Sequence, residues 1–337
     1  MFVRFLALDR KSDSTDRWPT SSVTEAAPGR TSTPNDLVTD RVSGVVEIAG
    51  EFDTGVKLET LVDLLPEHGP ATVSDLRGWI QAHPGAGRIS GERVVGPERP
   101  DFVVDGERHQ RAERYYQAAV SLFASAFPGT RPLLRCVAVT GSTAYGDPRA
   151  GDDCDLMAVV RPGSVWVFIT YAFLRLRLRR WVRPIPTEPE WCLNYVLDED
   201  TAIQEFSRPR GFLFAREALV ARPVEGEAYY RGLLDRGEWM RHEAPGLYAR
   251  WRSGSGPASA LSEPAPGAIR IINALLFPVL ATYLQFKGLW TNLRLRRAGR
   301  EGETFRTITR PGRMALASRK FERLAARMAP ANRAARE

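Results

Sequence analysis

The sequence predicts an α+β protein, in which a short mixed β-sheet with helices forms the core, a small module precedes it and a helical domain follows it. Two short apolar runs, 134–140 and 156–160, are typical of buried strands. Residues 107–127 repeat apolar side chains at helical spacing and predict an amphipathic helix before the first strand. With 337 residues, the chain is long enough for such a core with sizeable appendages.

The N-terminal segment 1–45 is expected to be a disordered tail. Residues 10–36 are polar and rich in Ser, Thr and Pro. Such a composition cannot bury enough apolar surface to offset the entropy that an ordered chain loses.

Residues 46–106 predict a small helical module that ends in a wing-like strand. The leucines between residues 58 and 65 share one helical face, Thr72 or Ser74 can cap a second helix, and residues 93–95 form the strand. This order resembles a winged-helix module, which implies a reader of nucleic acid or of a partner. We favour a structural cap or a dimerisation surface, because the second helix has no basic face.

Residues 107–200 are expected to form the core, and residues 201–337 a helical C-terminal domain with a basic tail. The apolar stretch 271–290 predicts a buried helix, because polar residues interrupt it well short of the ~20 apolar residues that a membrane span needs. A membrane-surface role is the alternative for this stretch. From residue 294 onwards the chain carries 13 basic and 4 acidic side chains. The functional interpretation of this tail is contact with nucleic acid or an acidic partner, and the alternative is a frayed terminus.

The charge distribution and the cysteine content limit the classes of protein to which this chain can belong. The net charge of +7 belongs to the tail, since the residues before 294 carry 34 basic and 36 acidic side chains. Three cysteines cannot form an even disulfide framework and show no CxxC spacing for zinc. The apolar run at residues 1–9 is too short for a signal peptide. We therefore expect a cytoplasmic protein without a transmembrane segment.

The candidate site is the segment that joins the two predicted strands. The first strand ends in Gly141 and Ser142, and a ten-residue connection returns to Asp153 and Asp155. Side chains at i and i+2 of a strand point to the same face, so the two carboxylates project together and repel each other unless a cation lies between them. Such a pair suits a hard divalent cation, Mg²⁺ or Mn²⁺. Gly141 lets a phosphate approach the backbone, and Ser142 adds a hydroxyl and an amide donor.

These residues resemble the signature of the polymerase-β-type nucleotidyltransferase superfamily, which is an apolar strand, Gly-Ser, a short connection and Asp-x-Asp between apolar residues. The matching segments are Val139-Thr140-Gly141-Ser142 and Asp153-Cys154-Asp155-Leu156, and a weaker likeness extends over residues 55–245. The resemblance implies a nucleotidyltransferase core, with Asp153 and Asp155 as catalytic ligands of Mg²⁺ and with Gly141 and Ser142 as contacts of the triphosphate.

The resemblance also implies the reaction. A nucleoside monophosphate would pass from a nucleoside triphosphate, ATP among the candidates, to an acceptor hydroxyl or another nucleophile, with release of pyrophosphate. The acceptor stays open between a small molecule, a protein and an RNA.

A third carboxylate, which the superfamily usually places on a later strand, is missing from the matching position. The predicted strand 191–197 offers Asn194 there, whose amide can bind a nucleotide or a metal but cannot take a proton. Acids on either side of this strand could substitute, namely Glu188, Glu190, Asp198, Glu199 and Asp200. The alternative function is therefore a non-catalytic nucleotide-binding or DNA-binding regulator.

Overall fold

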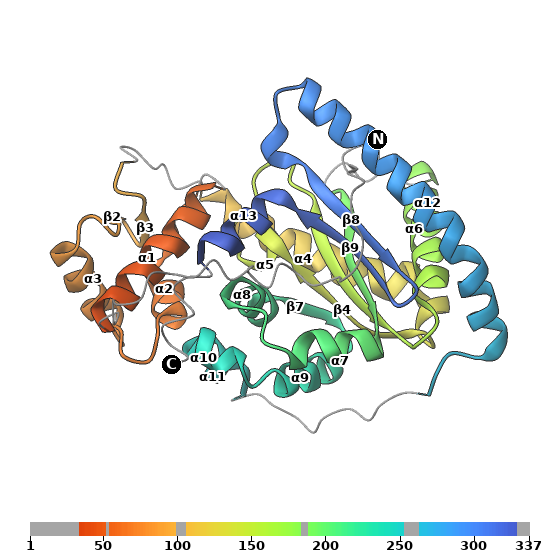
Figure 1. The fold of residues 1–337 in the computed structure, drawn as a ribbon, viewed down its shortest axis with the longest axis horizontal. Coiled ribbons are helices and arrows are strands. Elements are labelled where there is room, and N and C mark those ends of the chain that lie inside the picture. Colours follow the sequence, from red (N-terminus) through yellow and green to blue (C-terminus); the bar gives the residue numbers. More distant parts are fainter. Residues whose placement is uncertain (1–33, 52–53, 99–105, 183–187, 253–262, 329–337) are drawn as a thin grey trace, which may run out of the picture.

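The computed structural model describes residues 34–51, 54–98, 106–182, 188–252 and 263–328. It has the predicted α+β architecture, with one sheet of three strands, one mixed sheet of six strands, and helices that pack against both (Figure 1). The prediction of disorder for residues 1–33 falls outside the described residues.

The N-terminal module combines three helices with the three-stranded sheet. Its elements are α1 (Pro34–Glu51), β1 (Val56–Lys57), α2 (Leu58–Leu64), α3 (Val73–Ala82), β2 (Arg88–Ser90) and β3 (Arg93–Val95). The strands are antiparallel in the order β1-β3-β2. Of the two predicted caps, Thr72 is the one used, because its hydroxyl accepts a hydrogen bond from the N–H of Asp75 while the carboxylate of Asp75 accepts one from the N–H of Thr72.

Helix α1 shows that the prediction of disorder up to residue 45 was wrong. The helix begins at Pro34, and valines recur at helical spacing along it. Four of them are at most 3% exposed and belong to the core of the module, namely Val38, Val42, Val45 and Val46. The prediction failed because the Ser/Thr/Pro-rich composition of residues 10–36 was extended past its end.

The six-stranded sheet has the order β7-β4-β5-β6-β9-β8. Its strands are β4 (Leu134–Thr140), β5 (Cys154–Val160), β6 (Trp191–Asp198), β7 (Arg222–Glu225), β8 (Phe305–Arg310) and β9 (Arg313–Ser318). Strands β5 and β6 are parallel, and every other neighbouring pair is antiparallel. The strands predicted at 134–140, 156–160 and 191–197 are thus confirmed as the centre of this sheet.

Three of these strands correct the prediction that residues 201–337 form a helical domain. Strand β7 pairs with β4, and the β8–β9 hairpin pairs with β6, so the C-terminal part of the chain completes the sheet. In β8, Phe305 and Thr307 are buried while Arg306 between them is exposed, which is the period-two pattern of a strand. The many arginines hid this pattern in the sequence. Within the described part of the predicted basic helical tail, residues 305–318 form this hairpin and α13 (Arg319–Met328) is the short helix that follows it.

Helices cover both faces of the six-stranded sheet. The remaining helices are α4 (Glu107–Ala126), η1 (Pro128–Thr130), α5 (Gly141–Ala144), α6 (Val165–Val182), α7 (Glu199–Ser207), α8 (Phe212–Val220), α9 (Glu227–Arg236), α10 (Met240–Glu243), α11 (Pro245–Arg252), α12 (Gly267–Arg297), η2 (Glu301–Glu303) and α13 (Arg319–Met328). Helices α4, α6 and α12 share one core with Leu156 and Ala158 of β5. Helices α7 to α11 and the N-terminal module share the other core with Met157 and Val159. Alternate residues of β5 therefore point to opposite faces of the sheet.

Helix α12 is largely exposed, which contradicts the prediction of a buried helix. Of the large apolar side chains of α12, only those of Leu284 and Leu295 are fully buried. By length and composition alone, α12 is the one helix within the described ranges that could cross a membrane, and 17% of its most apolar stretch is buried. The prediction failed because α12 is apolar on both of its sides. Leu276, Phe277, Leu280 and Leu284 pack against the core, while a second set of apolar side chains lies on the exposed side.

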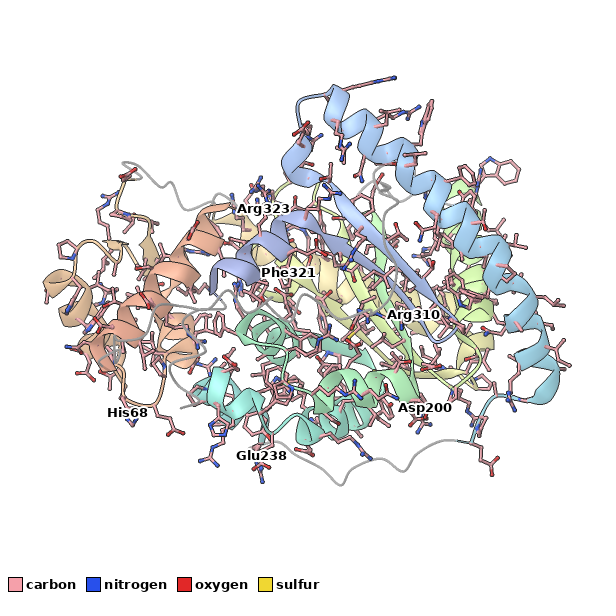
Figure 2. All side chains as sticks on the ribbon, viewed as in Figure 1. His68, Asp200, Glu238, Arg310, Phe321 and Arg323 are labelled. Atoms are coloured by element: carbon pink, nitrogen blue, oxygen red, sulfur yellow. The ribbon has the colours of Figure 1, made fainter. Side chains whose placement is uncertain are left out.

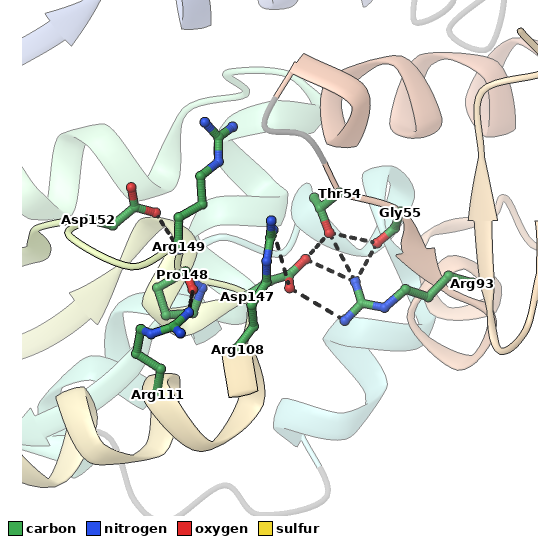
Figure 3. A network of polar contacts seen from close by, with 9 residues as sticks. All are labelled: Thr54, Gly55, Arg93, Arg108, Arg111, Asp147, Pro148, Arg149 and Asp152. Atoms are coloured by element: carbon green, nitrogen blue, oxygen red, sulfur yellow. Dashed lines mark hydrogen bonds and ion pairs between the residues drawn. The ribbon is translucent and has the colours of Figure 1, made fainter. Parts of the chain in front are cut away.

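A buried network of charged groups around Asp147 joins the N-terminal module to the connection between β4 and β5 (Figure 3). Arg93 of β3 donates hydrogen bonds from Nη1 to Oδ2 of Asp147 at 2.9 Å and to the backbone oxygen of Gly55 at 2.7 Å. Thr54 also donates to this carboxylate, and Nη1 of Arg108 lies 3.7 Å from its Oδ1. The module is thus held against the segment that carries the predicted site.

Asp147→Ala is expected to destabilise the fold by about 3–5 kcal/mol, because it leaves the nearly buried charges of Arg93 and Arg108 without their common partner. Urea unfolding followed by circular dichroism measures the change. Glu227→Ala is the control, since that carboxylate is 59% exposed and pairs with Arg231 one turn further along α9, and such pairs contribute about 0.3–0.5 kcal/mol. Equal effects of the two substitutions would contradict the role of the network.

Candidate functional site

The end of β4 and the start of β5 bring the Gly-Ser turn next to the acid pair. The strands pair with Thr140 opposite Asp155. Gly141 follows directly and has a φ of 64°, in the left-handed region. A Cβ at this position would lie 2.5 Å from Oδ2 of Asp155, which leaves no room for any side chain. Ser142 is the next residue, and its backbone oxygen accepts a hydrogen bond from the N–H of Asp147 at 3.0 Å. The turn and the carboxylate are therefore in direct contact.

Asp153, Asp155 and Cys192 form a cluster that could hold a metal ion. One ligand atom from each side chain lies within 4.8 Å of the others. Cys192 is brought there by β6, which runs parallel to β5 with Cys192 as the register partner of Asp155. Its thiol is hydrogen-bonded to both carboxylates. The sequence analysis missed Cys192 because it searched β6 for an acid or amide, and only the parallel register of β5 and β6 brings Cys192 to Asp155.

Asn194 lies in an irregular part of β6. The register between β5 and β6 shifts between Leu156, which pairs with Leu193, and Met157, which pairs with Tyr195, so Asn194 has no register partner on β5. Its Oδ1 is buried and has no hydrogen-bond partner among the described residues. A buried acceptor in this state favours a donor from a ligand or from water. The residue of β6 that lies next to Asp155 is nevertheless Cys192. The contact of Asn194 with a nucleotide stays a prediction.

Three of the five acids considered as a third ligand lie at the wrong end of β6. Asp198 pairs with Val160, the last residue of β5, so it lies five residues beyond Asp155, about 17 Å along the strand. Its Oδ1 accepts a hydrogen bond from the N–H of Thr201 at 2.9 Å and caps α7. Glu199 and Asp200 follow it in α7. These acids cannot complete the cluster.

The other two acids precede β6. Glu188 forms an ion pair with Arg179 at 2.5 Å. Glu190 is exposed, and its charge contributes to raising the pKa of Asp153. Of the five acids, Glu190 is thus the one that acts on the pair electrostatically.

Glu217 of α8 is hydrogen-bonded to the turn. Its carboxylate accepts hydrogen bonds from the N–H of Gly141 and from the hydroxyl of Tyr145, the latter at 2.5 Å. Its charge also contributes to raising the pKa of Asp155. The sequence analysis missed Glu217, although a lone acid within the apolar helix at 212–220 was a signal that could have been followed.

The electrostatics of the cluster favour a bound cation. Burial raises the pKa of Asp153, and burial together with the charge of Asp153 raises the pKa of Asp155 well above its usual range. Burial and the two carboxylates likewise raise the pKa of the Cys192 thiol, which therefore stays protonated at neutral pH. A divalent cation between the carboxylates would relieve this repulsion. The donor set thus fits a metal with two carboxylate ligands and a neutral third neighbour.

Comparisons of the chain with models of known protein families, with curated proteins and with solved structures find no match. The functional interpretation therefore depends on the residues of the site and on their geometry.

Asp155→Asn is expected to stabilise the metal-free protein at neutral pH. Folding raises the pKa of Asp155, so the ionised carboxylate is less favourable in the folded protein than in the unfolded chain. The contribution of the protonated carboxyl to the free energy of unfolding is complete below the unfolded pKa of about 3.9 and is lost as the pH rises through the folded pKa. An asparagine side chain does not ionise, so the variant keeps its stability over this pH range. In EDTA, the free energy of unfolding of the variant relative to the wild type should therefore increase with pH, as measured by urea titration.

Addition of Mg²⁺ provides the second measurement for Asp155→Asn. The ion should raise the melting temperature of the wild type and leave that of the variant unchanged, because ligand binding to the folded state alone is stabilising. If the stability of the variant relative to the wild type did not rise with pH, the carboxylate of Asp155 would not oppose folding. If the variant still responded to Mg²⁺, Asp155 would not be a ligand of the metal.

Proposed function

We propose that this protein is a nucleotidyltransferase of the polymerase-β type, which transfers a nucleoside monophosphate from a nucleoside triphosphate to an acceptor with release of pyrophosphate. The observation that carries the proposal is the contact between the Gly141 turn and Asp155 within the pair of acids that begins β5. It places a glycine turn of the kind that contacts a phosphate next to two carboxylates for a metal.

The mixed sheet and its helices are consistent with the proposed nucleotidyltransferase core. The motif lies between adjacent antiparallel strands, and a parallel third strand, β6, lies beside the acids. In the N-terminal module, two helices and a short hairpin follow β1, the order that suggested a winged helix. We assign that module as winged-helix-like within the same proposal.

In this proposal, Asp153 and Asp155 would hold Mg²⁺ or Mn²⁺, which when bound stabilises negative charge on the reacting phosphate. Gly141 lets Asp155 pack directly against the turn, and Glu217 accepts a hydrogen bond from the N–H of Gly141. The turn at Gly141 and Ser142 would contact the triphosphate. Because the Cys192 thiol stays protonated, β6 supplies no carboxylate that could take the proton of the acceptor. The acceptor, whether a small molecule, a protein or an RNA, would then lose its proton to water or to a base of its own.

The basic C-terminal segment gives less support to nucleic-acid binding than its composition suggests. Three of its arginines form ion pairs, Arg300 with Glu303, Arg306 with Glu322 and Arg313 with Glu205. Part of the positive charge is therefore neutralised within the fold. We keep an RNA acceptor only as one of the three classes.

The second candidate function is a non-catalytic nucleotide-binding or DNA-binding regulator. The observation that favours it is Cys192, which stands beside Asp155 where a third carboxylate would lie. Calorimetry separates the two functions, because tight binding of a nucleoside triphosphate without turnover, or salt-dependent binding of duplex DNA, would favour the regulator.

Asp153→Ala and Asp155→Ala are each expected to lower nucleotidyl transfer by about 10³-fold or more, because a metal ligand contributes several kcal/mol to charge stabilisation. The assay follows labelled nucleotide from each triphosphate into products, with Mg²⁺ and a cell extract that supplies acceptors. Asp200→Ala is the matched control, since Asp200 is an exposed acid of α7 beyond the far end of β6. Absence of labelled product with the wild type, or unchanged labelling in the alanine variants, would refute the function.

Cys192→Asp is expected to strengthen Mg²⁺ binding about tenfold or more, because a third carboxylate oxygen replaces a neutral thiol at the register partner of Asp155. Isothermal titration calorimetry with Mg²⁺ alone measures this without any assumption about the substrate. Cys192→Ser is the control, since it keeps a neutral side chain of similar size and should change the affinity little. Equal affinities of the aspartate and serine variants would place Cys192 outside the metal site.

A further inference from the structure

Helices α6 and α12 carry all the large apolar side chains that are exposed within the described part of the chain. Those on α6 are Leu174, Leu178 and Trp181, and those on α12 are Ile271, Ile272, Leu275, Val279, Tyr283, Phe286, Leu289, Trp290 and Leu293. The exposed fraction reaches 85% for Trp181 and 68% for Leu275. Because the two helices pack against each other, these side chains form one surface, which we name the α6–α12 face. An exposed apolar surface of this extent indicates a site of interaction.

The exposed side chains of α12 follow one stripe of the helix. Between residues 271 and 293, apolar side chains recur with steps of three or four residues, which is the spacing of a single helical face. In Figure 2 the side chains on the outer side of α12 project away from the rest of the molecule. The stripe is continuous over most of the 31-residue helix.

The opposite side of α12 is fastened to the core by apolar side chains, among them Phe277 and Leu284, and by polar side chains along the length of the helix. Asn273 accepts a hydrogen bond from the N–H of Trp166 at 2.7 Å. Gln285 donates to the backbone oxygen of Thr307 at 3.2 Å, and Asn292 donates to the backbone oxygen of Phe305 at 3.1 Å. These bonds would be lost if α12 left the sheet to cross a bilayer, where unsatisfied polar groups are costly. The attached helix can offer its stripe only to a surface that lies alongside it.

The charges on the two helices indicate which kind of surface the α6–α12 face binds. Neither helix contains an acidic residue. Arginines flank the apolar stripe, and those that are exposed are Arg177, Arg270, Arg294, Arg296 and Arg297. Two copies of the chain that met through this face would bring like charges together. An anionic lipid surface complements both the arginines and the apolar stripe.

We propose that the α6–α12 face binds the surface of an anionic membrane, with α12 parallel to the bilayer plane and its apolar stripe inserted at the level of the headgroups. The arginines at the ends of the stripe contact lipid phosphates. Trp181 and Trp290, which are 85% and 54% exposed, have the amphipathic character that suits this interface. This inference does not depend on the proposed reaction.

Flotation with lipid vesicles tests the proposal on the full-length protein. Vesicles of phosphatidylcholine alone are compared with vesicles of equal parts phosphatidylcholine and phosphatidylglycerol. We expect binding to the mixed vesicles that is about tenfold or more tighter than to phosphatidylcholine alone and that weakens as salt is added. The readout is the fraction of protein that floats at each lipid concentration.

Two pairs of substitutions separate the apolar and the charged contributions. Leu275→Gln with Phe286→Gln changes side chains that are 68% and 66% exposed, so the fold should be retained. Arg296→Glu with Arg297→Glu reverses two exposed charges at the end of the stripe. Each pair is expected to weaken binding to the mixed vesicles about tenfold or more. The matched control is Arg236→Glu with Arg241→Glu, which makes the same change of charge on α9 and α10 and should leave binding within about twofold.

Four results would overturn the proposal. The first two are equal binding of the wild type to both vesicle types and binding to neither. The third is a control pair that weakens binding as much as Arg296→Glu with Arg297→Glu. The fourth is a dimer in analytical ultracentrifugation that Leu275→Gln with Phe286→Gln dissociates, which would show that a second copy of the chain covers the face. Circular dichroism of each variant verifies that the fold is intact.

Discussion

The pairing of β4 with β5 is the constraint on which the candidate site depends. Because Thr140 lies opposite Asp155, the residue after Thr140 must fit against that carboxylate, and the space there admits only a glycine. A shift of one residue would turn Asp155 away from the turn and move the buried apolar side chains of β5 to the wrong face. The packing of the core and the geometry of the site therefore specify the same register, and neither can change without the other.

The same register brings carboxylates close together, and their mutual repulsion opposes folding. Asp153, Asp155 and Glu217 all have raised pKa values, with burial as the main cause. The strands hold the acids in place, since Cys154 and Leu156 between and beside them are fully buried on the other face of the sheet. An arrangement that lowers stability and is retained within a well-packed core is typical of a functional site. This is the physical reason to interpret the cluster as a binding site rather than as a solvated loop.

The sequence predicted the local elements well and the long-range arrangement less well. Strands β4 and β5 and helix α4 have strong periodicity, and Thr72 has its capping partner three residues away, so short-range rules were sufficient. Strand β8 was missed because arginines occupy its exposed positions, and the exposure of α12 depends on which neighbours exist. Cys192 was missed for a related reason, because only the parallel register of β5 and β6 determines which residue faces Asp155. No local pattern contains that register.

Helix α12 carries apolar side chains on both of its sides. On the inner side, Phe277, Leu280 and Leu284 pack against the core, and the hydrogen bonds of Asn273 and Asn292 fix the helix near both of its ends. On the outer side, a second set of apolar side chains is exposed as a stripe. A helix needed only for stability would be apolar towards the core and polar towards solvent. Packing within the fold therefore accounts for only one side of α12, and an exposed apolar surface of this extent indicates a contact outside the fold.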